Sequence, residues 1–158
     1  MAGREDGIGL TLTLVPGDPS VAPGQARWCR LVLQNQATDS LWVNRRLAVN
    51  HPVSPPHLRE VDFLVQDAHG RVAEFTAKVR VGRPGPEDFV ELAPGETVER
   101  PFDLTFYYDL VPGEAYQVLA VYENYCVPVS LKDTRVWTGR LASHPLKISP
   151  AAESPVPA

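Results

Sequence analysis

Apolar and polar residues alternate with a period of two along four stretches of the chain, namely 10–14, 29–33, 61–65 and 73–81. The longest of these stretches places five apolar residues on one side: Ala73, Phe75, Ala77, Val79 and Val81. Alternation of this kind is typical of strands with one buried and one solvated face, as in antiparallel sheets. We therefore expect a strand at each of the four stretches.

Turn-forming residues separate these stretches. Asp67–Gly70 is typical of a tight hairpin, and Pro94-Gly95 divides two further short strands. Pro16–Asp18 and Pro23-Gly24 bracket the first connection, and no helical period persists for ten residues. We predict an all-β fold over residues 1–149: an immunoglobulin-like antiparallel β-sandwich of about 7–9 strands with Greek-key connections.

A tyrosine corner is expected at Tyr116, within Leu110–Val118. In this device a tyrosine near the start of a strand hydrogen-bonds to the backbone a few residues upstream. We expect the hydroxyl to satisfy a backbone acceptor. Val118 occupies the position of the antibody cysteine, so the antibody disulfide is not expected. Trp42, on a short third strand, is the expected core tryptophan.

Length and composition fit one domain without a metal or a disulfide framework. The chain has 158 residues, a net charge of −4 and two cysteines, Cys29 and Cys126. Free thiols are expected, with an inter-strand bridge as the alternative. The tail at 150–158 has little to bury, so we expect it to be disordered.

Charge and hydropathy limit the partners and the compartment. The acidic balance argues against binding nucleic acid, which needs a basic surface. No stretch reaches the ~20 apolar residues of a membrane span, so no membrane partner is expected. The N-terminal residues lack the apolar core of a secretory signal, which predicts a cytoplasmic protein.

The chain shows no recognisable catalytic or metal-binding pattern. The histidines at 51, 57, 69 and 144 have no metal-ligand spacing, and no Gly-x-Ser-x-Gly elbow or dense acidic calcium loop occurs. Cys29 lies on an apolar strand face and is expected to be inert. We predict that the protein is not an enzyme and holds no cofactor or metal.

Two long connections, 44–57 and 122–135, are the candidate binding loops, since sandwiches carry function on loops held by a rigid scaffold. The alternative for both is a solvated connection that covers a sheet edge. Their aromatic and basic residues are the candidate partner-binding positions. These residues are Arg45, Arg46, His51, His57, Tyr122, Tyr125, Lys132 and Arg135.

The half of the chain from Glu91 onward resembles a known kind of domain. The segments Glu91–Glu96, Phe102–Thr105, Pro112–Val118 and Val136–Ser143 are similar to strings in bacterial immunoglobulin-like domains. They resemble the non-catalytic N-terminal β-domain of deuterolysin-like and peptidyl-Lys metalloendopeptidases. The zinc-binding His-Glu-x-x-His of those proteases is absent. The resemblance therefore implies an accessory sandwich without protease activity.

We expect a non-catalytic intracellular protein-interaction or scaffold module, a subunit or regulator of a larger assembly. Its partner would be another protein or a second copy of the chain. This expectation rests partly on fold analogy, which supports function weakly. A carbohydrate-binding or adhesion sandwich is one alternative, and an enzyme with an unrecognised active site is another.

Overall fold

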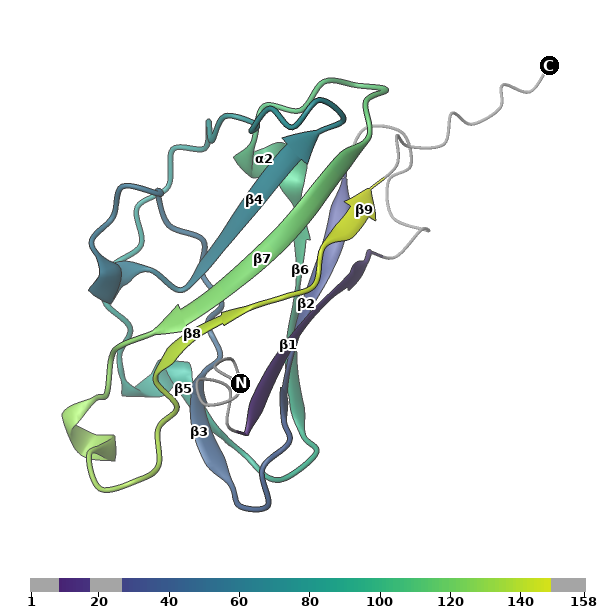
Figure 1. Cartoon of the computed structure of the whole chain (residues 1–158). Helices are drawn as coiled ribbons and strands as arrows, with labels where there is room; N and C mark the ends of the chain where they lie inside the picture. Colours follow the sequence, from purple (N-terminus) through teal and green to yellow (C-terminus); the bar gives the residue numbers. More distant parts are fainter. Residues whose placement is uncertain (1–8, 18–26, 149–158) are drawn as a thin grey trace.

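The computed structural model describes residues 9–17 and 27–148, and within them nine β-strands dominate (Figure 1). The strands are β1 (Leu10–Pro16), β2 (Trp28–Asn35), β3 (Leu41–Asn44), β4 (Val61–Asp67), β5 (Phe89–Leu92), β6 (Thr97–Asp103), β7 (Tyr116–Asn124), β8 (Gly139–Ala142) and β9 (Leu146–Ile148). The helical elements are single turns: η1 (Pro56–Leu58), η2 (Pro86–Asp88), α2 (Leu104–Tyr107) and η3 (Val129–Leu131). The predicted all-β class is confirmed. The turn at Pro23-Gly24 and the tail at 150–158 lie outside the described residues.

The strands form an immunoglobulin-like antiparallel sandwich. One sheet has the order β1-β2-β6, and the other has the order β4-β7-β8. The strand β9 pairs with the first residues of β7, and β8 pairs with its last residues. In Figure 1 the β4-β7-β8 layer lies in front of the β1-β2-β6 layer. The strands β3 and β5 form a separate antiparallel pair. The chain changes between the β1-β2-β6 and β4-β7-β8 sheets three times: from β2 to β4, from β4 to β6 and from β6 to β7.

The core lies where the alternating apolar faces meet. The predicted inward sets from 10–14, 29–33 and 61–65 are all buried. In β1 and β2 their register places Leu12 opposite Leu33, so both strands direct leucines to the same side. Val118 and Ala120 of β7 are buried as well. Burial of these alternating faces accounts for the packing of the two layers.

Among the described residues the segment predicted as a strand at 73–81 belongs to no β-ladder, so that expectation is wrong. After the turn at Asp67–Gly70 the segment contacts its neighbours through isolated bridges, Gln66 with Val72 and Phe75 with Tyr108. Exposure nevertheless alternates residue by residue from Ala73 to Val81, with the apolar side half-buried. The alternation of exposed and half-buried side chains is therefore present although the segment has no hydrogen-bonded neighbouring strand among the described residues.

The core tryptophan is Trp137 and not Trp42. Trp137 is buried, and its ring stacks on Tyr122 with centroids 5.5 Å apart. Trp42 is half-buried, because its neighbours Leu41 and Val43 take the inward positions of β3. Successive side chains of a strand point to opposite faces, so Trp42 is directed away from the core.

The tyrosine corner is present, with the opposite hydrogen-bond direction from that expected. The Tyr116 hydroxyl oxygen accepts from the Val111 N–H at 2.7 Å. The Arg27 guanidinium lies 5.6 Å from the centre of the Tyr116 ring. Its nitrogens donate to the carbonyls of Glu114 at 3.0 Å and Val111 at 3.3 Å. Arg27 therefore stabilises the turn that precedes β7 by hydrogen bonds to its backbone carbonyls.

Candidate partner-binding site

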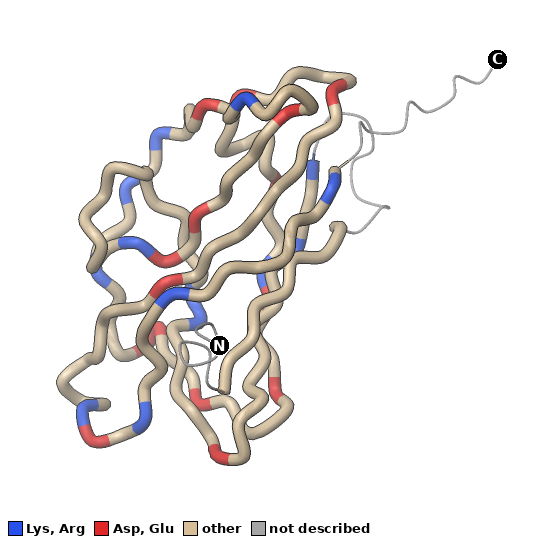
Figure 2. The backbone as a smooth tube through the Cα atoms, in the orientation of Figure 1, with Lys and Arg blue, Asp and Glu red and all other residues tan. Residues whose placement is uncertain are grey.

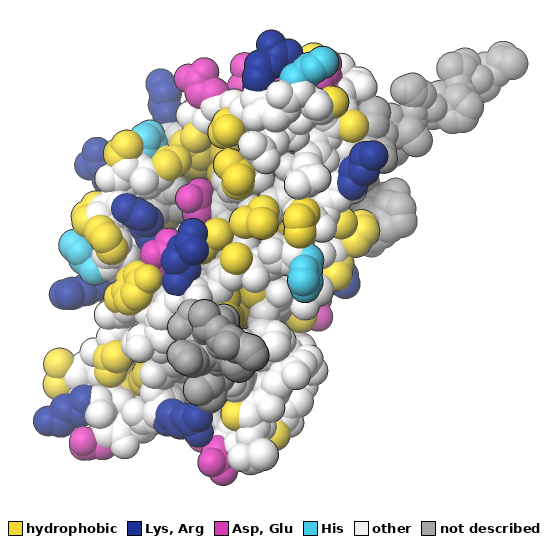
Figure 3. Space-filling view, in the orientation of Figure 1, with side chains coloured by type: hydrophobic (Ala, Val, Ile, Leu, Met, Phe, Trp, Pro, Cys, Tyr) yellow, Lys and Arg dark blue, Asp and Glu magenta, His cyan; other side chains and the backbone are white. Residues whose placement is uncertain are grey.

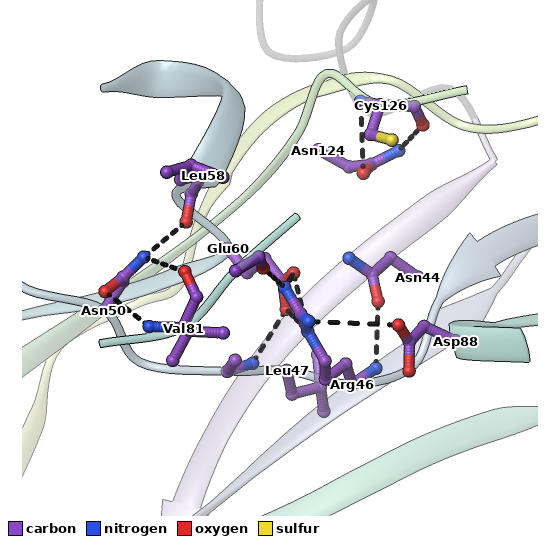
Figure 4. Close-up of polar contacts among 12 residues, drawn as sticks. Asn44, Arg46, Leu47, Asn50, Leu58, Glu60, Val81, Asp88, Asn124 and Cys126 are labelled. Carbon is purple, nitrogen blue, oxygen red and sulfur yellow. Dashed lines mark hydrogen bonds and ion pairs between the residues drawn. The ribbon is translucent and has the colours of Figure 1, made fainter. Parts of the chain in front are cut away.

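The first part of the candidate loop at 44–57 belongs to the buried interior of the protein. Leu47, Ala48 and Val49 are buried, and Leu47 has a φ of 47°. The side chain of Asn50 donates to the carbonyls of Leu58 at 3.1 Å and Val81 at 2.9 Å (Figure 4). Residues 44–50 are therefore fixed structure, which corrects the expectation of one long irregular binding loop.

Arg46, a predicted binding residue, forms an ion pair with the buried carboxylate of Glu60. Its Nε donates to the Glu60 carboxylate at 3.0 and 3.2 Å, and its Nη2 contacts the same group (Figure 4). The same Nη2 donates to the Gly82 carbonyl at 2.7 Å. Glu60 is 3% exposed and also accepts from the Ala48 N–H. The Arg46 guanidinium is therefore engaged within the fold, which corrects the expectation that it contacts a partner.

The other three candidates of this loop are exposed. Arg45 donates from its guanidinium to the Glu87 carbonyl at 3.2 Å. The His51 ring packs edge-on against Phe75, with centroids 5.3 Å apart, and its Nδ1 accepts from the Val53 N–H. His57 lies on η1. The structure does not gather these side chains into one site.

Tyr122, also predicted as a binding residue, is in the centre of the core. It is fully buried in β7, and its hydroxyl donates to the Asn44 carbonyl at 3.0 Å. Burial raises the pKa of this phenol, and the Glu60 carboxylate adds to the rise. The strand β7 continues to Asn124, so the second loop begins later than expected.

The second loop proper, 125–136, keeps the remaining candidates at the surface. Tyr125, Lys132 and Arg135 are exposed. The guanidinium of Arg135 forms an ion pair with the Asp39 carboxylate, with Nη1 and Oδ2 3.8 Å apart. Burial raises the pKa of the Tyr125 phenol, with a further contribution from Glu123.

Asn124 fixes the two ends of this loop, a role that the sequence did not indicate. Its side-chain nitrogen donates to the carbonyls of Cys126 at 3.1 Å and Trp137 at 2.9 Å. Its oxygen accepts from the Cys126 N–H (Figure 4). The loop is thus closed by a buried side chain, which holds its shape from within.

A surface hollow of about 840 Å³ lies between this loop and residues 83–86. Pro84 and Pro86 line one side, and Tyr125, Val127 and Val129 line the other, with Arg83 also at the wall. Val127 is 44% exposed and Val129 is 81% exposed. We call this feature the hollow. Figure 3 shows hydrophobic side chains beside Lys and Arg at the surface over the lower-left region, where Figure 1 places this loop.

The wall at 83–86 was not among the candidate binding segments predicted from the sequence. Its prolines and its η2 turn are the signals that could have suggested a preformed surface. The Asp88 carboxylate accepts from the Gly85 N–H at 2.9 Å, and the Asp88 carbonyl accepts from the Arg45 N–H at 2.8 Å. These bonds tie the wall to the end of β3.

The described residues offer little reactive chemistry. Among them no three His, Cys, Asp or Glu side chains cluster so as to hold a metal ion. Both cysteines are free thiols, as expected. Burial raises the pKa of the Cys29 thiol to about 12, so it remains protonated. No helix in the described part of the chain is long and apolar enough to span a membrane.

Compared with known proteins, the chain matches no family model and none of the curated proteins. The resemblance to the β-domain of the metalloendopeptidases therefore stays a prediction.

Proposed function

We propose that the protein is a non-catalytic, intracellular interaction module that docks an apolar segment of a partner protein in the hollow. The observation that carries the proposal is the exposure of Val127 and Val129. Both side chains line the hollow, which has a volume of about 840 Å³ and a mainly apolar lining. Apolar side chains gathered at a surface depression commonly mark a protein-binding site. Such a site would support a role as a subunit or regulator of a larger assembly.

The walls of the hollow are preformed. Asn124 closes the loop at 125–136, and Asp88 together with Arg45 ties down the wall at 83–86. Prolines at 84, 86 and 128 restrict the backbone further. A partner segment would therefore bind without a large ordering cost on this side, which favours affinity.

The distribution of exposed aromatic residues gives no support to the carbohydrate-binding alternative. A sugar platform needs aromatic rings side by side. In the described chain the strongly exposed aromatic residues are Phe106 and Tyr125. Phe106 lies on α2, and Tyr125 follows the opposite end of β7 (Figure 1). The two rings do not form one surface.

Affinity purification from the source cells tests the proposal. Val129→Asp places a charge in the hollow, whereas Val53→Asp changes a valine of the same 81% exposure outside it. Wild type and Val53→Asp should retain the same stoichiometric protein partner, and Val129→Asp should lose it. Equal retention by both variants, or no stoichiometric protein with the wild type, contradicts the proposal.

A further inference from the structure

The segment Ala77–Val81 is hydrogen-bonded to the rest of the fold at both of its ends. The N–H groups of Thr76 and Ala77 donate to the Tyr107 carbonyl at 2.9 and 3.3 Å. At the other end the Val81 N–H and C=O bond to the Asn50 side chain at 3.2 and 2.9 Å. The side chains of Ala77 and Val81 are half-buried, whereas that of Thr76 is exposed.

The intervening residues expose unpaired backbone. Lys78, Val79 and Arg80 make no backbone hydrogen bond within the described chain. The residue-by-residue alternation of exposure from Ala73 to Val81 indicates an extended backbone. Because backbone polar groups that are buried are almost always paired, we expect the unpaired groups of residues 78–80 to face solvent. Residues 77–81 therefore form an open strand edge.

The open edge is basic. The side chains of Lys78 and Arg80 are exposed, and neither forms an ion pair with a described carboxylate. Figure 2 shows Lys and Arg positions following one another along the side of the molecule beyond β4. Two copies paired through this edge would bring like charges together, which disfavours self-association here. An acidic strand would meet opposite charges.

We propose that the edge at 77–81 accepts an extended acidic segment of a partner protein by β-strand addition. The partner's backbone would bond to Lys78 and Arg80, and its outward carboxylates would lie beside their side chains. This mode explains why the strongest alternation in the sequence has no ladder partner in the described structure. It rests on the proposed role as an interaction module, and it uses a surface separate from the hollow.

Fluorescence anisotropy with synthetic peptides tests the inference. The probe is a labelled peptide Thr-Glu-Val-Glu-Val-Glu-Thr, compared with its lysine counterpart and with the same acidic peptide N-methylated at alternate residues. We expect the acidic peptide to bind at least about tenfold more tightly than either comparison peptide. The double variant Lys78→Glu/Arg80→Glu should reverse the preference toward the lysine peptide. Absence of binding by the acidic peptide overturns the proposal.

Two controls locate the bound peptide. Arg140→Glu/Lys147→Glu reverses two exposed charges on β8 and β9 and should leave the affinity within about twofold, since charge contacts act locally at physiological salt. Equal weakening by both double variants, or equal affinity for the N-methylated peptide, shows general charge attraction and overturns strand addition. Val129→Asp should leave peptide binding intact. Loss of binding in that variant would place the peptide in the hollow and overturn the edge proposal alone.

Discussion

The hydroxyl of Tyr122 donates to the backbone carbonyl of Asn44 at 3.0 Å, and the two residues are 78 positions apart in the sequence. Both residues are fully buried, and Trp137 stacks on the ring of Tyr122. This bond joins the centre of the β4-β7-β8 sheet to the end of β3, where the wall of the hollow is attached.

Tyr122→Phe should therefore destabilise the fold. Loss of the hydroxyl removes the donor that satisfies a buried carbonyl, at a cost of about 1–3 kcal/mol. Tyr125→Phe, which removes the hydroxyl of an exposed residue, should change stability by about 0.5 kcal/mol or less. Urea unfolding of both variants measures the difference. A Tyr122→Phe variant as stable as the wild type would contradict the role of this bond.

The adjacent arginines 45 and 46 offer a matched pair. Arg46→Ala leaves the Glu60 carboxylate buried without its partner, which should cost about 3 kcal/mol. Arg45→Ala removes an exposed side chain and should cost about 0.5 kcal/mol or less. Thermal or urea denaturation distinguishes them, and similar losses for the two variants would show that the Arg46–Glu60 pair is not critical.

The tyrosine corner predicts a graded response at Tyr116. Tyr116→Phe leaves the Val111 N–H without its acceptor at a partly buried position, so we expect a loss of about 1 kcal/mol. Tyr116→Ala also opens a cavity beneath Arg27 and should cost about 3–5 kcal/mol. Equilibrium unfolding in urea checks both values. Equal stability of Tyr116→Phe and wild type would remove the energetic case for the corner.

Cys29 predicts a pH dependence of stability. Burial raises the pKa of its thiol to about 12, from an ordinary value of 9.0. The unfolded chain therefore loses this proton first, so the contribution is complete below pH 9 and declines as the pH rises from 9 toward 12. Between about pH 8 and about pH 10, wild type should lose about 1 kcal/mol more stability than Cys29→Val. Parallel losses, measured by urea titration at each pH, would contradict the shifted pKa.

Local pattern predicted most of the strands because their side chains obey a period of two. The same pattern at 73–81 predicted a ladder that the described part of the chain lacks, because a hydrogen-bonded neighbouring strand depends on distant residues and leaves no local trace in the sequence. Trp42 was assigned to the core for a similar reason. Its strand was predicted, but which of its faces meets the core is decided by the packing of Leu41 and Val43.

The candidate site was predicted in part. Tyr125, Lys132 and Arg135 are surface residues of the second loop, as expected, whereas Tyr122 and Arg46 are structural. The error at Tyr122 arose because the polar residues Glu123 and Asn124 gave no sign that they continue a strand whose last five residues are all buried. The hollow joins two segments about 40 residues apart. No sequence pattern relates those segments.

Site-specific photo-crosslinking tests the central claim most directly. A benzoylphenylalanine residue is placed at position 129 in the hollow or at position 53, where the natural valines are equally exposed at 81%. After irradiation in the source cells, the protein labelled at position 129 should form one discrete adduct with a partner protein, and the protein labelled at position 53 should not. Adducts of the same pattern and yield from both positions, or none from position 129, would contradict the assignment of the hollow as the partner-binding site.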